Sequence, residues 1–277
     1  MSFQDKLLDS FIAFEQVIDL DNPIHTDRKN ALKRFESKGF PTKKDELWKY
    51  TSLKSITQKD YSLSVKNNPN VGLKDIKKYS INDIDSYKIV FVDGVFNPFL
   101  SNTTHDGMDV CVLSAALSKS KYKKTINKYF NNIVPDDQSL ASLNTSYTQE
   151  GAYIHIPKSV LPEDPVQILH FSSGKNKPLW LQPRNIIIVE ENARVEIIER
   201  HQSLRTHDGV TNSLTEIYAE KNSFIDYYKI QNDLETSNLI DNTFIDQQRD
   251  SNVRVHTFSF GGKLTRNNLN FYHKGEN

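Results

Sequence analysis

Apolar side chains near the start of the chain recur at the spacing of an amphipathic helix. Five of them fall three or four positions apart and so share one helical face: Phe3, Leu7, Phe11, Phe14 and Ile18. Ala31, Leu32 and Phe35 repeat the pattern after Thr26 or Asp27, either of which can cap the start of a helix. The pattern therefore predicts two amphipathic helices at the beginning of the chain.

A short helical turn is predicted within residues 39–51. Thr42 and Asp45 have the spacing of a capping box, and the aromatic residues Trp48 and Tyr50 follow directly. We expect both aromatic side chains to hold this turn in place by packing. Lysines surround the pair at four positions: Lys43, Lys44, Lys49 and Lys54. Stacking on a nucleotide base is the alternative, but Asp45 and Glu46 offset the positive charge, which favours local packing.

The middle of the chain mixes short extended and helical patterns. Asp93-Gly94 separates the apolar runs 88–92 and 95–96 and is a strong hairpin signal. Another helical face is formed by Tyr122, Ile126, Tyr129, Phe130 and Ile133. Three other segments are expected as a polar loop, a strand and a short helix, respectively 58–70, 109–113 and 139–146.

From Gly151 onward the helical spacing disappears and short β-branched and aromatic runs alternate with polar turns. The runs lie at 153–156, 166–171, 186–189, 195–198, 214–218, 224–230 and 253–260. A sandwich, a barrel or a solenoid would each show such a pattern. We place Ile187 and Phe224 at inward positions, where an aspartate would destabilise the β region. Two domains are predicted: a mainly helical one with a small hairpin at 1–150, and a β domain at 151–277.

A repeated turn favours the solenoid among these alternatives. The turns are Glu191-Asn192-Ala193, Lys221-Asn222-Ser223 and Asp250-Ser251-Asn252, and Gly275-Glu276-Asn277 falls where a fourth would open. A period of about 30 residues is typical of solenoids, whose units bury their apolar faces by stacking. We therefore expect a fourth copy to be interrupted at Asn277, which leaves the edge of the β region unpaired.

Composition excludes several classes of function. The 35 basic and 35 acidic residues balance, so no overall charge is available to bind nucleic acid or an acidic membrane. Cys111 is the only cysteine, which excludes an internal disulfide, a thiolate-only zinc site and a four-thiolate iron-sulfur cluster held by this chain alone. The acidic N-terminus is unlike a signal peptide, and we expect a cytoplasmic protein.

Histidines and carboxylates are numerous but show no catalytic or metal-binding spacing. The histidines are dispersed at His25, His105, His155, His170, His201, His207, His256 and His273. His155, His170 and His256 lie in predicted strands and could converge, although ordinary hydrogen bonding explains them as well. Carboxylates in the β region include Glu190, Glu191, Glu196, Glu199, Asp241, Asp246 and Asp250. Cys111 lies in an apolar strand and is expected to be packed. We predict no catalytic residue and no metal site.

Several motifs together resemble one protein family. They are Pro41-Thr42-Lys43-Lys44-Asp45-Glu46-Leu47-Trp48-Lys49-Tyr50-Thr51-Ser52-Leu53 and the segments 91–96, 141–144, 212–231 and 258–269. In order and spacing they are similar to the SufB/SufD family of iron-sulfur cluster assembly scaffolds. The opening motif resembles the SufD branch, and the scaffold cysteines of the SufB branch have no counterpart in these repeats.

The resemblance implies an α+β protein, in which a helical N-terminal domain precedes a right-handed parallel β-helix. It further implies a non-catalytic scaffold subunit that acts with SufB and the ATPase SufC. An iron-sulfur cluster would be the product of that complex and not a cofactor of this chain. The family's contact regions for both partners lie mostly beyond Asn277. No nucleic acid or membrane partner is expected.

Two other functions are alternatives to the scaffold hypothesis. Some β-solenoids cleave polysaccharides with paired carboxylates, so the chain could be a carbohydrate-active enzyme. It could also be a stand-alone interaction module, because an unpaired β edge templates association with another chain. Close carboxylates in a groove would favour the first alternative, and self-association of the purified chain would favour the second.

Overall fold

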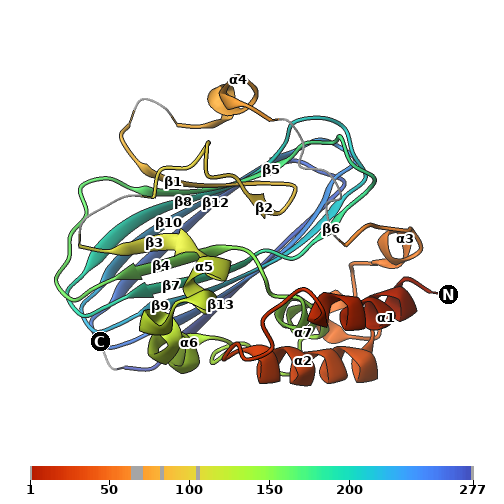
Figure 1. Cartoon of the computed structure of the whole chain (residues 1–277), viewed down its shortest axis with the longest axis horizontal. Helices are drawn as coiled ribbons and strands as arrows, with labels where there is room; N and C mark the ends of the chain where they lie inside the picture. Colours follow the sequence, from red (N-terminus) through yellow and green to blue (C-terminus); the bar gives the residue numbers. More distant parts are fainter. Residues whose placement is uncertain (1, 64–70, 82–83, 104–106, 276–277) are drawn as a thin grey trace.

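Two β-sheets face each other and form the walls of a parallel β-solenoid of about four turns, preceded by a helical region (Figure 1). The computed structural model of the chain describes residues 2–63, 71–81, 84–103 and 107–275. Each turn crosses from one sheet to the other, so consecutive turns pair strand on strand. The parallel β-helix expected from the repeated turns and from the family resemblance is confirmed.

The six-stranded sheet has the order β12-β10-β8-β5-β1-β2, and only β1 and β2 pair antiparallel. Its strands are β1 (Tyr87–Val92), β2 (Val95–Phe96), β5 (Val166–Ser172), β8 (Arg194–Ser203), β10 (Phe224–Asp233) and β12 (Asn252–Gly261). The seven-stranded sheet has the order β13-β11-β9-β7-β4-β3, and a short strand, β6, pairs with β9 beside it. Its strands are β3 (Asp109–Val112), β4 (Ala152–Ile156), β6 (Trp180–Leu181), β7 (Arg184–Val189), β9 (Val210–Ala219), β11 (Asn238–Gln247) and β13 (Leu264–His273).

Three of the turns that lead from the seven-stranded sheet to the six-stranded sheet, those after β7, β9 and β11, are alike. Each closes with a backbone hydrogen bond across four residues, at 190–193, 220–223 and 248–251. The third residue of each turn has a positive φ, and these residues are Asn192, Asn222 and Asp250. Asparagine and aspartate tolerate this left-handed conformation, which explains the repeated motif. The sequence repeat placed Asn252 in the third turn as the counterpart of Asn192 and Asn222, and this was wrong. Asn252 is the first residue of β12, and Asp250 has the positive φ in that turn.

Inward-facing apolar residues form the main core between the two sheets. Ile187, Ile197 and Ile217 are fully buried there and belong to one contiguous cluster. Side chains alternate between the two faces of a strand, so every second residue points inward. Ile187 is inward as expected, but Phe224 points outward and is 46% exposed, because the inward positions of β10 begin at Ile225.

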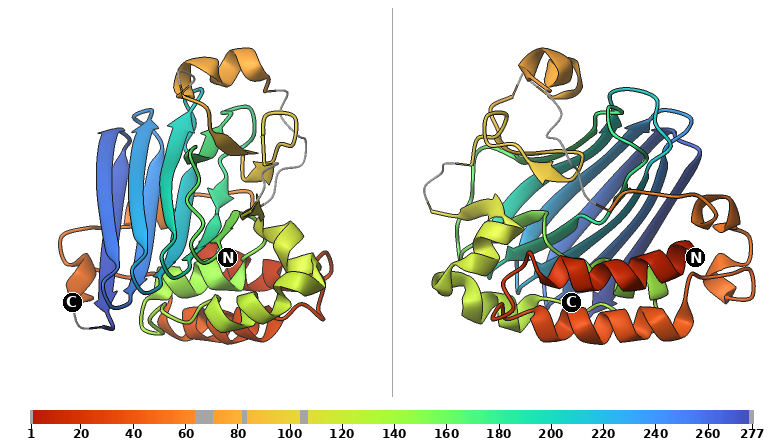
Figure 2. Two further views of the ribbon diagram at one scale, coloured as in Figure 1. Left: turned by 90° about the vertical axis from the view of Figure 1, so that its left-hand side faces the viewer. Right: turned by 45° about the vertical axis from the view of Figure 1, so that its right-hand side comes forward.

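Helices cover the outer face of the seven-stranded sheet (Figures 1 and 2). The longer ones are α1 (Phe3–Glu15), α2 (His25–Lys38), α5 (Leu113–Ser118), α6 (Lys123–Tyr129) and α7 (Ser139–Ser146). The shorter ones are η1 (Glu46–Trp48), α3 (Lys54–Thr57), α4 (Leu73–Ile76), η2 (Lys77–Tyr79) and η3 (Ser120–Tyr122). In contrast to the others, α4 and the adjoining η2 lie against β1 and β5 of the six-stranded sheet. Within the described residues, no helix combines the length and the apolar character needed to cross a membrane.

The predicted helices are present, with differences at their ends. α1 ends at Glu15, so Ile18 lies beyond it. α2 is preceded by Ile24, which offers no side-chain hydrogen bond, so neither Thr26 nor Asp27 caps it. The hairpin at Asp93 and the short helix at 139–146 are confirmed. Residues 64–70 of the expected polar loop, His105, Glu276 and Asn277 lie outside the described residues.

The segment that carries the opening motif reaches across the molecule to β13. Trp48 is buried, and the guanidinium of Arg266 lies 4.2 Å from the centroid of its ring. The same guanidinium donates hydrogen bonds to the hydroxyl of Thr51 and to the backbone carbonyl of Leu47. Tyr50, by contrast, is 92% exposed, so only one member of the aromatic pair packs as expected. With Arg266 over its ring, Trp48 is part of the core contact and not a surface for a nucleotide base.

The sheets also include strands from before the predicted domain boundary. β1 lies within residues 1–150, yet it pairs with β5 over its full length. β3, also within that range, pairs antiparallel with β4. The division at residues 150 and 151 stays a prediction from the change in sequence pattern.

Candidate functional site

A group of polar and charged side chains lies inside the solenoid, where the rest of the interior is apolar. We name it the interior polar cluster, and its members are His170, Glu199, His201, Tyr227, Lys229 and Asp241. All six are buried. They come from four strands, namely β5, β8, β10 and β11. Charged groups are rarely buried this completely unless other groups pair with them, so the contacts of each member decide what the cluster can do.

The alternation of β8 and β10 explains how these residues come together. Glu199 and His201 are two residues apart, so both point inward from β8, after the inward residue Ile197. The parallel register places His170 beside His201 and Lys229 beside Glu199. Each of these pairs therefore occupies equivalent positions on neighbouring turns, and the cluster extends along the solenoid.

Glu199 is the centre of the cluster. Its Oε1 accepts a hydrogen bond of 2.8 Å from Asn185 Nδ2 and lies 3.5 Å from Nε2 of both His170 and His201. Its Oε2 accepts a hydrogen bond from the Tyr227 hydroxyl and lies 3.8 Å from Lys229 Nζ. Histidines therefore occupy one side of the carboxylate, and an ammonium and a phenol occupy the other.

Lys229 joins Glu199 to the opposite sheet. Its ammonium forms an ion pair with Asp241 and donates a hydrogen bond of 2.6 Å to the Thr243 hydroxyl. Two carboxylates thus flank one ammonium in a place with almost no contact with water. Breaking such a buried pair is costly because one charge is left without a partner.

Burial and neighbouring charges shift the pKa values in the cluster. Burial alone would raise the pKa of Glu199, but Lys229 and the two imidazoles hold it well below its usual range. Burial lowers the pKa of His170. Burial also opposes the charged form of His201, yet the nearby Glu199 carboxylate outweighs it and raises the His201 pKa. The two stacked histidines are therefore shifted in opposite directions.

Only one of the three histidines expected to converge lies inside the solenoid. His170 does, whereas His155 points outward from β4 and pairs with Glu190, 2.8 Å away. His256 is exposed on β12 and stacks on Tyr228. The partner of His170 is instead His201, whose ring stacks on it with centroids 4.6 Å apart.

The carboxylates named from the sequence divide between the interior and the turns. Glu199 and Asp241 belong to the interior polar cluster. Glu191 pairs with Lys158, Glu196 with Arg194, and Asp250 with Arg249. Asp246 accepts a hydrogen bond from the side chain of Gln248. Each of these outer carboxylates has a polar partner of its own, as solvated turn and strand residues usually do.

A second buried ion pair joins the helices to the solenoid. Arg184 on β7 and Glu216 on β9 are fully buried and 2.5 Å apart. Glu216 also accepts hydrogen bonds from the backbone of Asn131 and from the Tyr218 hydroxyl. The guanidinium donates a further bond of 2.9 Å to Thr145 on α7. This pair has a structural explanation, because it fixes α7 on the outer face of the sheet.

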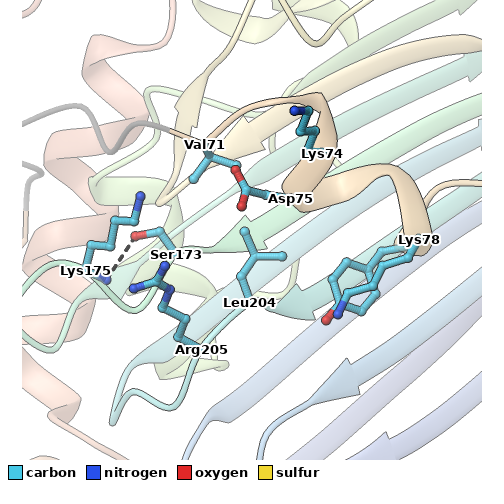
Figure 3. Close-up of a pocket in the computed structure, with 9 residues that line it drawn as sticks. Val71, Lys74, Asp75, Lys78, Ser173, Lys175, Leu204 and Arg205 are labelled. Atoms are coloured by element: carbon cyan, nitrogen blue, oxygen red, sulfur yellow. Dashed lines mark hydrogen bonds between the residues drawn. The ribbon is translucent and has the colours of Figure 1, made fainter.

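A basic cavity of about 350 Å³ lies under α4 and is drawn in Figure 3. Its walls carry Lys74, Lys78, Lys175 and Arg205, with Asp75 as an acidic neighbour. The Asp75 carboxylate accepts a hydrogen bond from the backbone of Gly72 at the start of α4. The cavity is open to solvent and its charges stand on flexible side chains, so it is less specific as a site than the interior polar cluster.

Cys111 and the N-terminal lysines do not form a reactive site. Burial raises the pKa of the Cys111 thiol to about 11, so the group is a thiol and not a thiolate at neutral pH. Its side chain packs against the core formed by α5, α6 and β7. Lys43, Lys44 and Lys49 are exposed, and the ammonium of Lys49 lies over the ring of Tyr50.

The sequence named four of the six members of the interior polar cluster, but only as dispersed histidines and carboxylates and not as a group. Lys229 and Tyr227 were not among the candidates. A signal was available, because His170 and His201 stand at paired positions of successive turns, separated by nearly the same interval as Asn192 and Asn222. Applying the turn period to charged and imidazole side chains would have aligned His170 with His201 and Glu199 with Lys229.

Comparison with known families agrees with the two-part fold. Residues 1–168 match the SufBD protein N-terminal region, and residues 170–277 match the SufBD core domain of the SUF system for FeS cluster assembly. Together these two regions cover nearly the whole chain in the expected order. The chain belongs to the SufBD family.

Curated proteins from two bacteria and a plant are similar to this chain over most of its length. The SufBD family protein slr0076 of Synechocystis is 25% identical over 257 residues, which are 90% of this chain and 56% of the relative. SufD of Escherichia coli is 24% identical over 243 residues, with 86% and 53% of the two chains covered. Protein ABCI7, chloroplastic, of Arabidopsis thaliana is 24% identical over 268 residues, which are 91% of this chain and 54% of the relative. The chain therefore spans about half the length of these three relatives.

Membership in the SufBD family confirms the resemblance at the level of the family. It assigns the chain to the SUF system of iron-sulfur cluster assembly. Identities near 24% to both SufD and other SufBD proteins do not distinguish the SufD branch from the SufB branch. The branch, and with it the choice of partners, is taken up below.

Proposed function

We propose that this chain is part of a SufD-type scaffold subunit, which acts with SufB and the ATPase SufC in iron-sulfur cluster assembly. The observation that carries the proposal is the ordered match of both SufBD regions on a helical region and a parallel solenoid. SufBD proteins are generally non-catalytic scaffolds, and we assign no reaction to this chain. A stiff stack of turns suits such a role, because it transmits movement between partners.

The SufD branch is supported by cysteine content. A scaffold that holds a cluster through thiolates needs cysteine ligands. Here the one cysteine, Cys111, lies on β3 beside the helices, with its thiol pKa raised by burial. The opening motif around Trp48 favours the same branch. A cytoplasmic location is part of this proposal.

The test is co-purification from one expression host. The full product of the gene, carrying an affinity tag, is expressed with SufB and SufC, and in parallel with SufD and SufC. We expect a stable three-component complex with SufB and SufC, and none with SufD and SufC. An Ile187→Asp variant, in which the solenoid core should be strongly destabilised, controls for capture by unfolded protein. Assembly with SufD in place of SufB would reverse the branch, and no assembly with either would refute the proposal.

Self-association is a second candidate, favoured by the state of the last turn. β12 and β13 each pair with a strand on one side only among the described strands. Leu269 and Phe271 of β13 are partly exposed, and Phe258 and Phe260 of β12 are about half exposed. An unpaired apolar edge of this kind promotes strand addition. Light scattering of the purified 277-residue chain should show dimers or larger species, and a strictly monomeric product would contradict this candidate.

The carbohydrate-active alternative finds no support in the carboxylates on which it rested. Glu199 and Asp241 share Lys229 inside the solenoid. A pair of acids for glycoside cleavage has to face a substrate groove with room for a sugar ring.

A further inference from the structure

His170, Glu199 and His201 present three metal-ligating side chains to one point inside the solenoid. One donor atom from each lies within 4.8 Å of the other two. His170 is on β5, and the other two residues are on the neighbouring strand β8 (Figure 1). The two imidazoles stack almost in parallel, with 9° between their planes, and Nε2 of each lies on the Oε1 side of Glu199.

Both of these nitrogens lack a hydrogen-bond partner. Nε2 of His170 and Nε2 of His201 are buried, and at 3.5 Å from the Glu199 carboxylate neither forms a hydrogen bond to it. Buried polar atoms are normally satisfied, and those that are not call for an explanation. Asp241 Oδ1 and Gln231 Oε1 are likewise unpartnered in the same interior. The cluster thus holds unused nitrogen and oxygen donors where ordinary packing would leave none.

The balance of charge in the interior also favours a bound cation. Glu199 and Asp241 are both carboxylates, and Lys229 is the one ammonium between them. Lys229 lies closest to Asp241, on the Oε2 side of Glu199, so the Oε1 side faces only Asn185 and the two imidazoles. A cation bound between the two imidazoles and Glu199 Oε1 would therefore balance the charge of the second carboxylate. It would lie on the opposite side of Glu199 from the Lys229 ammonium, which limits the repulsion between the two positive charges.

We propose that His170, Glu199 and His201 form a binding site for one divalent transition-metal ion inside the solenoid. Two imidazoles and a carboxylate are a borderline donor set that suits Fe²⁺, Co²⁺ and Zn²⁺ and disfavours Mg²⁺ and Ca²⁺. Ligands around such an ion lie about 2.1 Å from it and so about 3 to 3.5 Å from each other. Binding therefore draws the three donor atoms together and tilts the two rings out of their parallel stack.

The surrounding residues fit this site. Asn185 Nδ2 donates to the coordinating carboxylate, and the Tyr227 hydroxyl donates to its other oxygen. Such outer partners orient a ligand and tune its affinity. Phe91 stacks on the far side of His170 with ring centroids 5.0 Å apart, so the column of rings supports the first imidazole. A narrow pocket lined by His201, Lys229, Gln231 and Asp241 leads to the cluster from the side of β12 and β13.

The experiment titrates the chelator-treated 277-residue chain with Co²⁺ alone, without oxygen, and follows visible absorption. We expect one ion per chain, and X-ray absorption at the cobalt edge should show two imidazole ligands and oxygen. His170→Phe and His201→Phe keep a ring in the stacked column, and each should weaken binding by more than about 100-fold, beyond what loss of an outer partner costs.

His155→Phe is the matched control, because it removes a strand histidine that also has a carboxylate partner. It should leave Co²⁺ binding unchanged. Circular dichroism and thermal melting establish that each protein is folded. If a cluster variant does not fold, the ligand count from wild-type X-ray absorption decides, and fewer than two imidazoles overturns the site.

Two further outcomes would also overturn it. One is the absence of saturable binding to the folded wild-type chain. The other is binding that survives both His170→Phe and His201→Phe. SufB and SufC take no part in the titration, so its result is independent of whether the chain assembles with them.

Discussion

Each sheet carries a column of inward-facing residues that stack in register, and the two columns have opposite chemistry. We call the interior around the first column the apolar half and that around the second the polar half. In one half, Ile154, Ile187, Ile217 and Ile245 stack at paired positions on successive turns. In the other half, the column that begins with the apolar residues Ile89 and Ile168 continues as Glu199 and then Lys229. Backbone geometry is the same in both, so the difference lies entirely in the side chains.

This comparison separates what holds the fold from what it contains. Stacked isoleucines bury apolar area at about 25 cal/mol per Å² and need no partner of a particular kind. Buried charges contribute little net stability and become costly as soon as one member is lost. Burial in the apolar half is enough to explain why the solenoid is stable. Stability does not explain the buried charges of the polar half, and the metal site that we propose there does.

The largest effect should follow from placing a charge in the apolar half. Ile187→Asp leaves an unpaired carboxylate in a fully buried position and should cost more than about 4 kcal/mol of stability. Phe224→Asp is the matched control, since its side chain points outward from the start of β10, and it should cost less than about 1 kcal/mol. Urea unfolding followed by circular dichroism measures both. Equal losses would mean that the inward and outward faces are misassigned.

A smaller effect is expected from removing one charge in the polar half. Lys229→Met leaves Glu199 and Asp241 without their cation and should cost about 3 to 5 kcal/mol.

Removing all three charges together, with Glu199→Leu, Lys229→Met and Asp241→Leu, should recover most of that loss or exceed wild-type stability. The same unfolding experiment compares the two variants. A combined variant as unstable as Lys229→Met would show that the charges themselves stabilise the solenoid, and the contrast between the two halves would fail.

The smallest effect concerns a buried carboxylate that has no cation. Burial raises the pKa of Glu150 to about 7, whereas Lys229 and the imidazoles hold that of Glu199 low. Because the folded pKa of Glu150 is raised, its contribution to stability is present below about pH 4.5 and is lost as pH rises through 7. Glu150→Gln should therefore match wild type in acid and exceed it by up to about 3 kcal/mol near pH 8. Unfolding across this pH range measures the difference, and one that does not vary with pH would contradict the prediction.

Local sequence patterns predicted the elements that are determined by residues close together in the chain. The helical face of Phe3, Leu7 and Phe11 and the hairpin at Asp93 depend on near neighbours, and both are present. β11 was missed, because it is buried along its whole length and its sequence mixes Asp241, Asn242 and Phe244 without alternation. A strand covered on both faces gives no alternating pattern, so periodicity could not find it.

The interior polar cluster could not be assembled from the sequence because its members lie on four strands. His170 and His201 meet only through the register of β5 and β8, and Lys229 meets Asp241 only across the two sheets. The histidines that were singled out by strand position alone, His155 and His256, point away from the interior. Which face a strand residue occupies changes with a shift of one position, as the outward side chain of Phe224 shows.

The sequence by itself determined the helical start, the turn period and the family, because each depends on residues close together or on motifs in a fixed order. Tertiary structure decided which polar side chains leave the water and which of them meet. Stacking turns in parallel register brings residues about one turn apart in sequence into contact. For that reason Glu199, unremarkable among the acidic residues of the chain, becomes the centre of a buried group with two imidazoles and an ammonium around it.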